Sequence, residues 1–228
     1  MNATARLLDL GRMPYRDALA LQRTLHAGVA RGEMPDTWLL VEHDPVVTLG
    51  RNAKLTNLHA APEWLAARGV DIVSVERGGD ATYHGPGQLV VYPICKLPRF
   101  REIVPFVSKL ERAVVRSLAA FGIEAAGRPE HRGVYVGREA ICAVGLAVKQ
   151  MTSMHGLALN VSTQLDYDRL IVPCGTPEFG ITSISRHVER TVTLEEARGT
   201  LVPELAAVFE TSFHAMPAAA VDLMEMAS

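Results

Sequence analysis

The fold is decided by the stretch Arg77-Gly-Gly-Asp-Ala-Thr-Tyr-His-Gly-Pro-Gly-Gln-Leu-Val-Val-Tyr92. Four glycines and one proline fall within its first eleven residues. Before it, the segment 70–75 alternates apolar β-branched and polar side chains, and an apolar run resumes at Leu89. This pattern predicts a strand, a glycine-rich loop and a second strand.

The loop contains more glycines and polar side chains than a turn requires. Glycine lets the backbone take positive φ and lets a ligand approach the main chain without meeting a Cβ. Arg77, Thr82, Tyr83, His84 and Gln88 add donors and an aromatic ring. A two-residue hairpin needs one or two glycines, so a ligand-binding loop is favoured. No Walker spacing is present and no helical pattern follows, which argues against a nucleotide-phosphate cradle.

The composition narrows the class of protein. With 228 residues and 48% hydrophobic composition, one globular domain over residues 1–228 is expected. A net charge of -2 gives no electrostatic reason to expect nucleic acid or an anionic membrane surface. Three cysteines without C-x-x-C spacing argue against a disulfide framework and a zinc ribbon, and suit a reducing cytoplasm. The amino terminus lacks a signal-peptide core, and no apolar run approaches the ~18 residues that span a bilayer.

The remaining pattern alternates helices and strands. Apolar residues recur at helical spacing over 15–31, which ends near Gly32, and over 62–68 and 101–121. A capping box at 193–196 opens a further helical stretch that reaches about residue 209. Gly199 and Pro203 are expected to split this stretch into two shorter helices. Strands are expected at 5–10, 38–43, 46–51 and 155–161, with hairpins joining 38–43 to 46–51 and folding 133–149 at Gly137. This order predicts an α+β fold with a mixed, mostly antiparallel sheet flanked by helices.

Cys174 is a candidate nucleophile. It lies between Pro173 and Gly175, which places it in a turn, and a turn thiol is more accessible than a core thiol. Cys95 and Cys142 lie within strand patterns and fit buried structural roles. His84 and His155 each precede a glycine and fit a Cys/His site, but no regular metal spacing joins them, so no metal is assigned.

The glycine-rich loop resembles the signature loop of the octanoyltransferases, the lipoate-protein ligase B family. Further stretches that resemble the family follow in the family's order over roughly residues 38–187, namely 40–51, 133–137, 141–145, 155–161 and 171–175. The resemblance implies the biotin/lipoate protein ligase fold, a monomer, and transfer of octanoyl from octanoyl-acyl carrier protein to a lysine of a lipoyl domain. The acceptors it implies are the lipoyl domains of 2-oxoacid dehydrogenases and the H protein of glycine cleavage.

The resemblance also implies the chemistry of the site. Cys174 would attack the donor thioester as a thiolate, and the acceptor lysine would attack the resulting acyl-enzyme; no cofactor is needed because the thioester is already activated. The implied octanoyl slot is lined by Arg77, Gly78, Gly79, Asp80, Ala81, Thr82, Tyr83, His84, Ala143, Val144, Gly145, Gly156, Leu157 and Ala158. A free cysteine has a pKa of ~8.5, so a nearby cation or base is required.

The sequence departs from the family at one position. Similar proteins carry a lysine that pairs with the cysteine as base, and this chain has Ala140 there. Three accounts follow: a variant that traps or disables turnover, replacement of the base by Lys149, His84 or His155, or a slow or inactive homologue. Strand alternation turns Lys149 away from the face of residue 140 unless a bulge at Gly145 shifts the register. An altered or weakened enzyme is therefore ranked first.

Three other functions compete with this interpretation. An ATP-dependent lipoate or biotin ligase shares the fold by resemblance but does not need Cys174. A non-catalytic acyl-binding protein gains weight from Ala140. A cysteine hydrolase would release free octanoate without an acceptor.

Overall fold

The computed structural model describes residues 3–53, 60–128, 130–165 and 179–217. The elements in chain order are β1 (Ala3–Met13), α1 (Tyr15–Arg31), β2 (Thr37–His43), β3 (Val46–Leu49), α2 (Pro62–Ala66), β4 (Asp71–Ser74), β5 (Ala81–His84), β6 (Gln88–Ile94), η2 (Phe100–Glu102), α3 (Ile103–Ala119), β7 (Ala126–Gly127), β8 (Gly133–Val136), β9 (Glu139–Lys149), β10 (Thr152–Asn160), β11 (Gly180–Ile181), α4 (Ile184–Val188), α5 (Leu194–Phe209) and β12 (Thr211–Met216).

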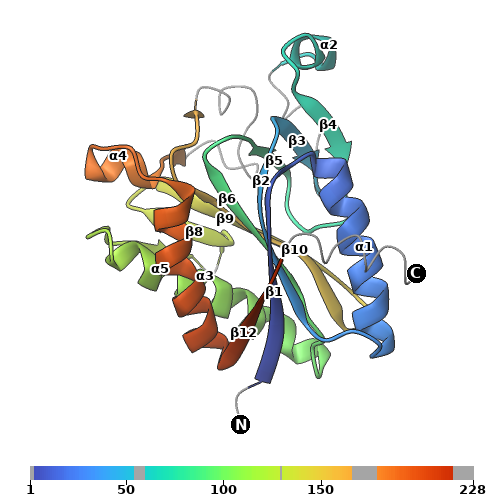
Figure 1. Cartoon of the computed structure of the whole chain (residues 1–228). Helices are drawn as coiled ribbons and strands as arrows, with labels where there is room; N and C mark the ends of the chain where they lie inside the picture. The colour runs from blue at the N-terminus through green and yellow to red at the C-terminus, as the bar shows by residue number, and fades with distance from the viewer. Residues whose placement is uncertain (1–2, 54–59, 129, 166–178, 218–228) are drawn as a thin grey trace.

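The main sheet has nine strands, of which eight follow the order β12-β1-β2-β6-β10-β9-β8-β7 while β11 pairs with β9. Most neighbours are antiparallel, but β1 is parallel to both β2 and β12, and β11 is parallel to β9. Helices α3 and α5 cover one face of this sheet and α1 covers the other (Figure 1). The predicted α+β architecture is confirmed.

The alternation of side chains along β2 creates two cores. Trp38 and Leu40 join the cluster that contains the apolar faces of α3 and α5. Leu39 and Val41 point to the opposite face and join the cluster that contains α1. Successive side chains of a strand point to opposite faces, so a continuous apolar run is the pattern expected of a strand covered on both sides.

The helices begin and end where local chemistry requires. Gly32 has φ 76° and terminates α1, as the sequence predicts. At the start of α5, the Thr193 hydroxyl accepts from the Glu196 backbone N–H at 3.1 Å and the Glu196 carboxylate accepts from the Thr193 backbone N–H at 2.8 Å. No helix in the described ranges is both long and apolar enough to cross a membrane.

The predicted split of the last helical stretch is wrong. Helix α5 is continuous from Leu194 to Phe209 with Pro203 inside it. Proline removes one helical hydrogen bond and costs about 3 kcal/mol in a helix interior. The buried positions Ala197, Leu201 and Leu205 recur every four residues and anchor both halves in one apolar cluster. This packing offsets the local cost.

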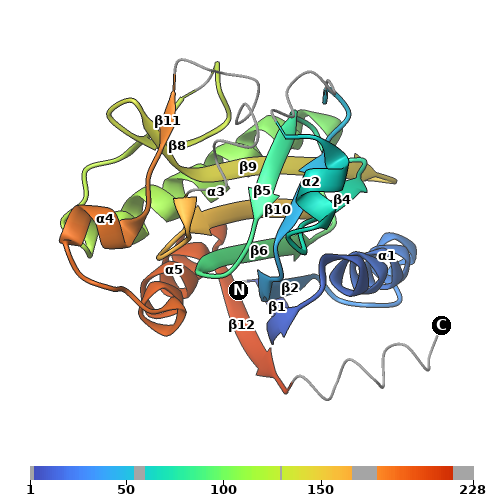
Figure 2. The ribbon, with the colours of Figure 1, turned by 90° about the horizontal axis from the view of Figure 1, so that it is seen from above.

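The predicted hairpin between β2 and β3 is also wrong. β2 pairs with β1 and β6 in the main sheet, whereas β3 pairs with β4 and β5 in a separate three-stranded sheet. Asp44-Pro45 therefore forms a corner between two sheets. Val46 belongs to the α1 cluster and Val47 to a smaller cluster beyond it, so β3 is buried on both sides without pairing to β2. Seen from above, β5 crosses in front of strands of the main sheet, with α2 and β4 beside it (Figure 2).

The predicted strands around the glycine-rich loop are present, with one addition. The loop is interrupted by β5, which pairs antiparallel with β3. The predicted hairpin over 133–149 is confirmed as β8 and β9, with Gly137 at φ 57° in its turn.

Candidate functional site

A cavity of about 420 Å³ lies between the main sheet and the segments that cross it. Its walls come from α1, the loop after β4, β5, β6, the first turns of α3, the segment before β8, and the middles of β9 and β10. The residues predicted for the site that line it are Arg77, Gly78, Gly79, Asp80, Thr82, His84, Ala143, Val144, Gly145, Gly156, Leu157 and Ala158. Segments that are far apart in sequence thus meet at one cavity.

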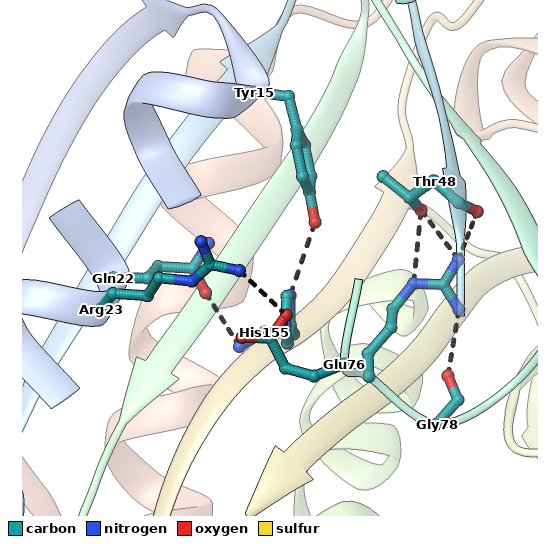
Figure 3. Close-up of polar contacts among 8 residues, drawn as sticks. Tyr15, Gln22, Arg23, Thr48, Glu76, Gly78 and His155 are labelled. Carbon is teal, nitrogen blue, oxygen red and sulfur yellow. Dashed lines mark hydrogen bonds and ion pairs between the residues drawn. The ribbon is translucent and has the colours of Figure 1, made fainter. Parts of the chain in front are cut away.

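Arg77 fixes the glycine-rich loop. Its side chain is buried, and its Nη2 donates to the carbonyl oxygen and hydroxyl of Thr48 at 2.9 and 2.7 Å, while Nη1 donates to the Gly78 carbonyl at 3.0 Å (Figure 3). The backbone N–H of Gly78 donates to the Leu146 carbonyl of β9 at 2.9 Å. The loop is therefore attached to the small sheet on one side and to the main sheet on the other.

The loop approaches its neighbours too closely for side chains. A Cβ on Gly50 would lie 2.5 Å from the Gly79 carbonyl oxygen and 2.8 Å from a guanidinium nitrogen of Arg77. Gly79 itself has φ 85°, a conformation that L side chains rarely adopt. These glycines serve close packing of main chain against main chain, beneath a wall of the cavity.

Ala81 and Tyr83 do not line the cavity. They alternate along β5 with Thr82 and His84, which do. Ala81 and Tyr83 are buried instead in the small cluster with Val47. The resemblance names a continuous run of residues, whereas the pleat of a strand presents only every second side chain to one face.

Tyr15, Tyr92 and His43 are buried at the α1 side of the cavity, and two of them, Tyr92 and His43, form a directed chain of hydrogen bonds. His43 Nδ1 must donate to the Met13 carbonyl at 2.9 Å, because a carbonyl only accepts. The neutral ring then accepts at Nε2 from the Tyr92 hydroxyl at 2.8 Å. Burial lowers the pKa of His43 to about 4, raises that of Tyr15 to about 12, and raises that of Tyr92 well above its ordinary value. All three groups are therefore neutral at pH 7.

His155 has an unusual backbone in the middle of β10. It has φ 58°, which is uncommon for a residue other than glycine, and its backbone N–H donates to Gln22 Oε1 at 2.9 Å. Its Nδ1 lies 3.5 Å from the Tyr15 hydroxyl, and its Nε2 lies 3.6 Å from Glu76 Oε2. Figure 3 shows Tyr15 and Gln22 reaching His155 from α1, with Arg23 beside Glu76. Strained residues of this kind cluster at functional sites.

The carboxylate of Glu76 is the charged member of this group. The adjacent His155 ring, the largest cause, and Arg23 hold the pKa of Glu76 at about 2. Burial lowers the pKa of His155 despite the nearby carboxylate. The Glu76–His155 contact is therefore a carboxylate beside a neutral imidazole at pH 7, and Arg23 lies 3.4 Å from the same carboxylate.

The three groups considered as substitutes for the missing lysine differ in position. Lys149 is exposed at the last residue of β9, well beyond the stretch 143–146 that lines the cavity. His84 and His155 both line the cavity, but burial lowers the pKa of each, and that of His84 lies well below its ordinary value. His84 Nδ1 lies 2.7 Å from Gln88 Oε1, so this nitrogen donates.

Ala140 lies outside the cavity lining, half-buried on β9 opposite Tyr135 and Ile181. The pairing register shifts next to it, and Ile141 and Cys142 are both buried in the same apolar cluster. The shift falls at Ile141 and not at Gly145, where the β9–β10 pairing is regular. The buried Cys142 and Cys95 occupy the structural positions expected of them. Cys174 lies outside the described residues.

Several cavity residues were not predicted from the sequence. They are Tyr15, Asn52, Val90, Tyr92, Ile103, Val107, Glu130, His131, Arg132, Tyr135, Leu146 and His155, of which only His155 was a candidate for another role. Tyr15 and Ile103 each begin a helix, and nothing in a helical pattern distinguishes an end that lines a cavity. Among the described residues no group of three histidine, cysteine or acidic side chains is arranged to hold a metal ion.

The chain has the fold of the lipoate and biotin protein ligases. A crystal structure of lipoate-protein ligase A bound with ATP matches with a TM-score of 0.79 at 18% identity, covering 99% of this chain and 95% of that one. A bipartite lipoate protein ligase studied with its E2 lipoyl domain, from Thermoplasma acidophilum, matches at 0.75 with 18% identity, over 98% of this chain and 92% of that one. Biotin protein ligase from Aquifex aeolicus matches at 0.53 with 10% identity, over 92% and 70%.

Sequence comparison gives the family. The model of the lipoyl protein ligase A/B catalytic domain matches residues 14–206. An octanoyltransferase of Syntrophobacter fumaroxidans is 44% identical over 205 residues, which cover 90% of each chain. An octanoyltransferase of Myxococcus xanthus is 40% identical over 215 residues, covering 91% of this chain and 60% of that longer protein. The chain therefore belongs to the lipoyl protein ligase A/B family and, within it, to the octanoyltransferases.

Proposed function

We propose that this acyltransferase moves an octanoyl group from octanoyl-acyl carrier protein to a lysine of a lipoyl domain through a thioester on Cys174. The Cys174 thiolate attacks the donor carbonyl, the bond to the carrier's phosphopantetheine sulfur breaks as the new thioester forms, and this sulfur leaves as a thiolate that takes a proton from water. The acceptor lysine amine then attacks that thioester, loses a proton as the amide forms, and releases the Cys174 thiolate. Atoms balance without ATP, because the donor is already activated.

The observation that carries this proposal is the cavity. The stretches that the resemblance assigns to an octanoyl slot meet around one cavity, although they come from the loop 77–80, β5, β9 and β10. Apolar side chains of Val107, Leu146 and Leu157 contribute to its walls. Burying six or seven methylenes at ~0.8 kcal/mol each would supply on the order of 5 kcal/mol of binding before ordering costs.

The described chain next to Cys174 also supports the proposal. Gly180 and Ile181 follow Cys174 by six and seven residues and pair with Glu139 and Ala140 of β9. The strand that receives them continues directly into Ala143 and the cavity lining. Cys174 thus belongs to a segment whose described end is attached beside the position where related enzymes have a lysine.

The proposed enzyme is slow relative to its family, because Ala140 supplies no base. Two other functions follow from specific observations. Ala140 also favours a non-catalytic acyl-binding protein, and the fold shared with lipoate-protein ligase A favours an ATP-dependent ligase. The cytoplasm is the proposed place of action because the cysteines are few and lack paired spacing.

The test is intact-mass and peptide mass spectrometry after incubation with octanoyl-carrier protein, followed by addition of a lipoyl domain. We expect an octanoyl adduct on Cys174 that disappears as the acceptor gains octanoyl, with no requirement for ATP and magnesium. Cys174→Ser should abolish the adduct. Transfer by Cys174→Ser at the unmodified rate would refute the acyl-enzyme, and transfer only with octanoate, ATP and magnesium would identify a ligase. Bound octanoyl-carrier without an adduct would identify an acyl-binding protein.

A further inference from the structure

The start of α3 exposes an unusual amount of apolar surface. Phe100 is 80% exposed and Val104 is 59% exposed. The only other exposed large apolar side chain among the described residues is Trp64 on α2, at a lower 40%. Exposed apolar side chains that lie together, with polar groups around them, mark sites of interaction with other proteins.

This surface adjoins the cavity. Ile103 and Val107, one helical turn apart, line the cavity from α3. Phe100 precedes Ile103 by about one turn, and Val104 is its immediate neighbour. One turn beyond Val104, the Ser108 hydroxyl accepts from Arg132 Nη1 at 3.3 Å, and Arg132 also lines the cavity. The exposed face of α3 is therefore continuous with the rim.

The same surface is basic. Between residues 99 and 112 there are four basic side chains and two acidic ones, although the whole chain carries -2. One of the four basic side chains, Lys109, lies over the Phe209 ring of α5 and does not belong to this surface. One of the two acids, Glu111, is buried and already bound by Arg132 at 3.2 Å and by the backbone N–H of Gly133 at 3.0 Å. Arg99 and Arg112 are exposed and form no ion pair within the described part of the chain. We call Arg99, Phe100, Arg101, Val104 and Arg112 the α3 surface.

We propose that the α3 surface docks the acyl carrier protein through an acidic face with an apolar centre, an inference that rests on the proposed function. Opposite charges across an interface steer the encounter, and an exposed aromatic side chain supplies a desolvated anchor. The surface lies beside the cavity rather than over it. A donor with a long phosphopantetheine arm docks there and still inserts its acyl chain, whereas an acceptor lysine, with its much shorter side chain, has to approach from directly above the reacting thioester.

The experiment compares two donors that present the same arm. Octanoyl transfer to a lipoyl domain is measured with octanoyl-carrier protein and with octanoyl-coenzyme A, for the unmodified chain, for Phe100→Ser and for the double variant Arg99→Glu/Arg101→Glu. We expect kcat/KM with the carrier to fall at least tenfold in both variants, while kcat/KM with octanoyl-coenzyme A changes less than twofold. Raising the salt concentration should lower the carrier-dependent rate of the unmodified chain, because salt screens the attraction between charges. The same increase should lower the carrier-dependent rate of the double variant by a smaller factor.

Matched controls are available on other elements. Trp64→Ser removes the other exposed aromatic side chain, on α2, and Arg31→Glu reverses an exposed charge at the end of α1. Figure 1 shows α2 far from α3, and Figure 2 shows α1 apart from α3. Neither control should change the ratio of kcat/KM with octanoyl-carrier protein to kcat/KM with octanoyl-coenzyme A. Equal losses with both donors, no loss with the carrier, or a rise in KM for the lipoyl domain alone would each overturn the proposal.

Direct binding separates this inference from the proposed function. The Kd of octanoyl-carrier protein is measured by calorimetry for the same variants without an acceptor. If the unmodified chain transfers nothing from either donor but binds the carrier with an affinity that depends on the α3 surface, the docking inference stands and the proposed function fails. If the unmodified chain transfers octanoyl and Phe100→Ser leaves the Kd unchanged, the proposed function stands and the docking inference fails.

Discussion

Gly156 of β10 lies against the carbonyl oxygen of Val91 in the neighbouring strand β6, so closely that a Cβ at position 156 would overlap this oxygen. The same Cβ would lie 2.7 Å from Cδ of Pro93. Both obstacles belong to β6, which with β10 lies at the centre of the main sheet, and Gly156 lines the cavity. At Gly156, the main chain of β10 therefore lies so close to β6 that no side chain fits at this position of the cavity wall.

Gly156→Ala is therefore expected to lower the free energy of unfolding by about 1–3 kcal/mol, since overpacked interiors cost about this much. The control is Gly199→Ala, because Gly199 lies in α5 with nothing within 4 Å of an added Cβ. In a helix this change should stabilise by up to about 1 kcal/mol. Urea unfolding of the two variants checks both signs. A Gly156→Ala chain as stable as the unmodified one would mean that β6 and β10 separate easily.

Ala140→Lys is expected to raise the octanoyl-transfer rate at pH 7 by about tenfold or more, since one general base contributes on the order of 10² to 10⁴. The matched control is Glu139→Lys, which places a lysine at the neighbouring position, where strand alternation turns it to the other face. Single-turnover kinetics with octanoyl-carrier protein measure both. An unchanged rate in Ala140→Lys would mean that another group activates Cys174.

Thr48→Val is expected to destabilise the glycine-rich loop, because it removes the hydroxyl that accepts from Arg77 Nη2 at 2.7 Å and Nε at 3.3 Å. Leaving a buried guanidinium without this acceptor costs about 1–3 kcal/mol. The Tm of thermal unfolding should fall, and the Kd for octanoyl-carrier protein should rise. Thr191→Val, at an exposed position between α4 and α5, is the control and should change neither quantity. Equal effects of the two substitutions would contradict the role assigned to Thr48.

His43 is expected to make the protein less stable in acid. Its pKa falls from an ordinary 6.5 to about 4 on folding because it is buried, so the unfolded chain binds the proton more readily between these values. Stability therefore falls as pH is lowered from about 6.5 to about 4, by roughly 3 kcal/mol for this group.

The measurement is urea unfolding at pH 7 and pH 4.5. Carboxylates also contribute in this range, so the informative quantity is the difference between the unmodified chain and His43→Gln. The His43→Gln variant should have a lower free energy of unfolding at pH 7, but this free energy should fall less between pH 7 and pH 4.5 than it does in the unmodified chain. An identical acid loss in both chains would show that His43 remains neutral in the unfolded state or charges in the folded one.

Local chemistry made part of this molecule predictable. The end of α1 at Gly32, the capping box at Thr193 and the turn at Gly137 each depend on residues within one or two turns of each other. The errors came from contacts that sequence spacing does not show. Pro203 remains in a helix because Leu201 and Leu205 are buried against distant segments, and β3 leaves β2 to pair with β5.

The residues of the candidate site were also predictable only in part. The resemblance located the glycine-rich loop and the middles of β9 and β10, but not the contribution of Tyr15, which meets His155 across 140 positions of sequence. Nor could it distinguish Tyr83 from His84, because which neighbour faces the cavity depends on the pairing of β5 with β3. Arg132 and Val107 reach the cavity only through the packing of α3 beside β8.

The parallel pairing of β1 with β12 has a consequence for biosynthesis. Ala3 is paired with Thr211, so β1, the first strand of the described sheet, waits for β12, the last one, before one of its edges is covered. Contacts between such distant segments form slowly, and an unpaired edge invites association with other chains. During translation, the nascent polypeptide is therefore most vulnerable to aggregation along β1, at the opposite edge of the sheet from β7.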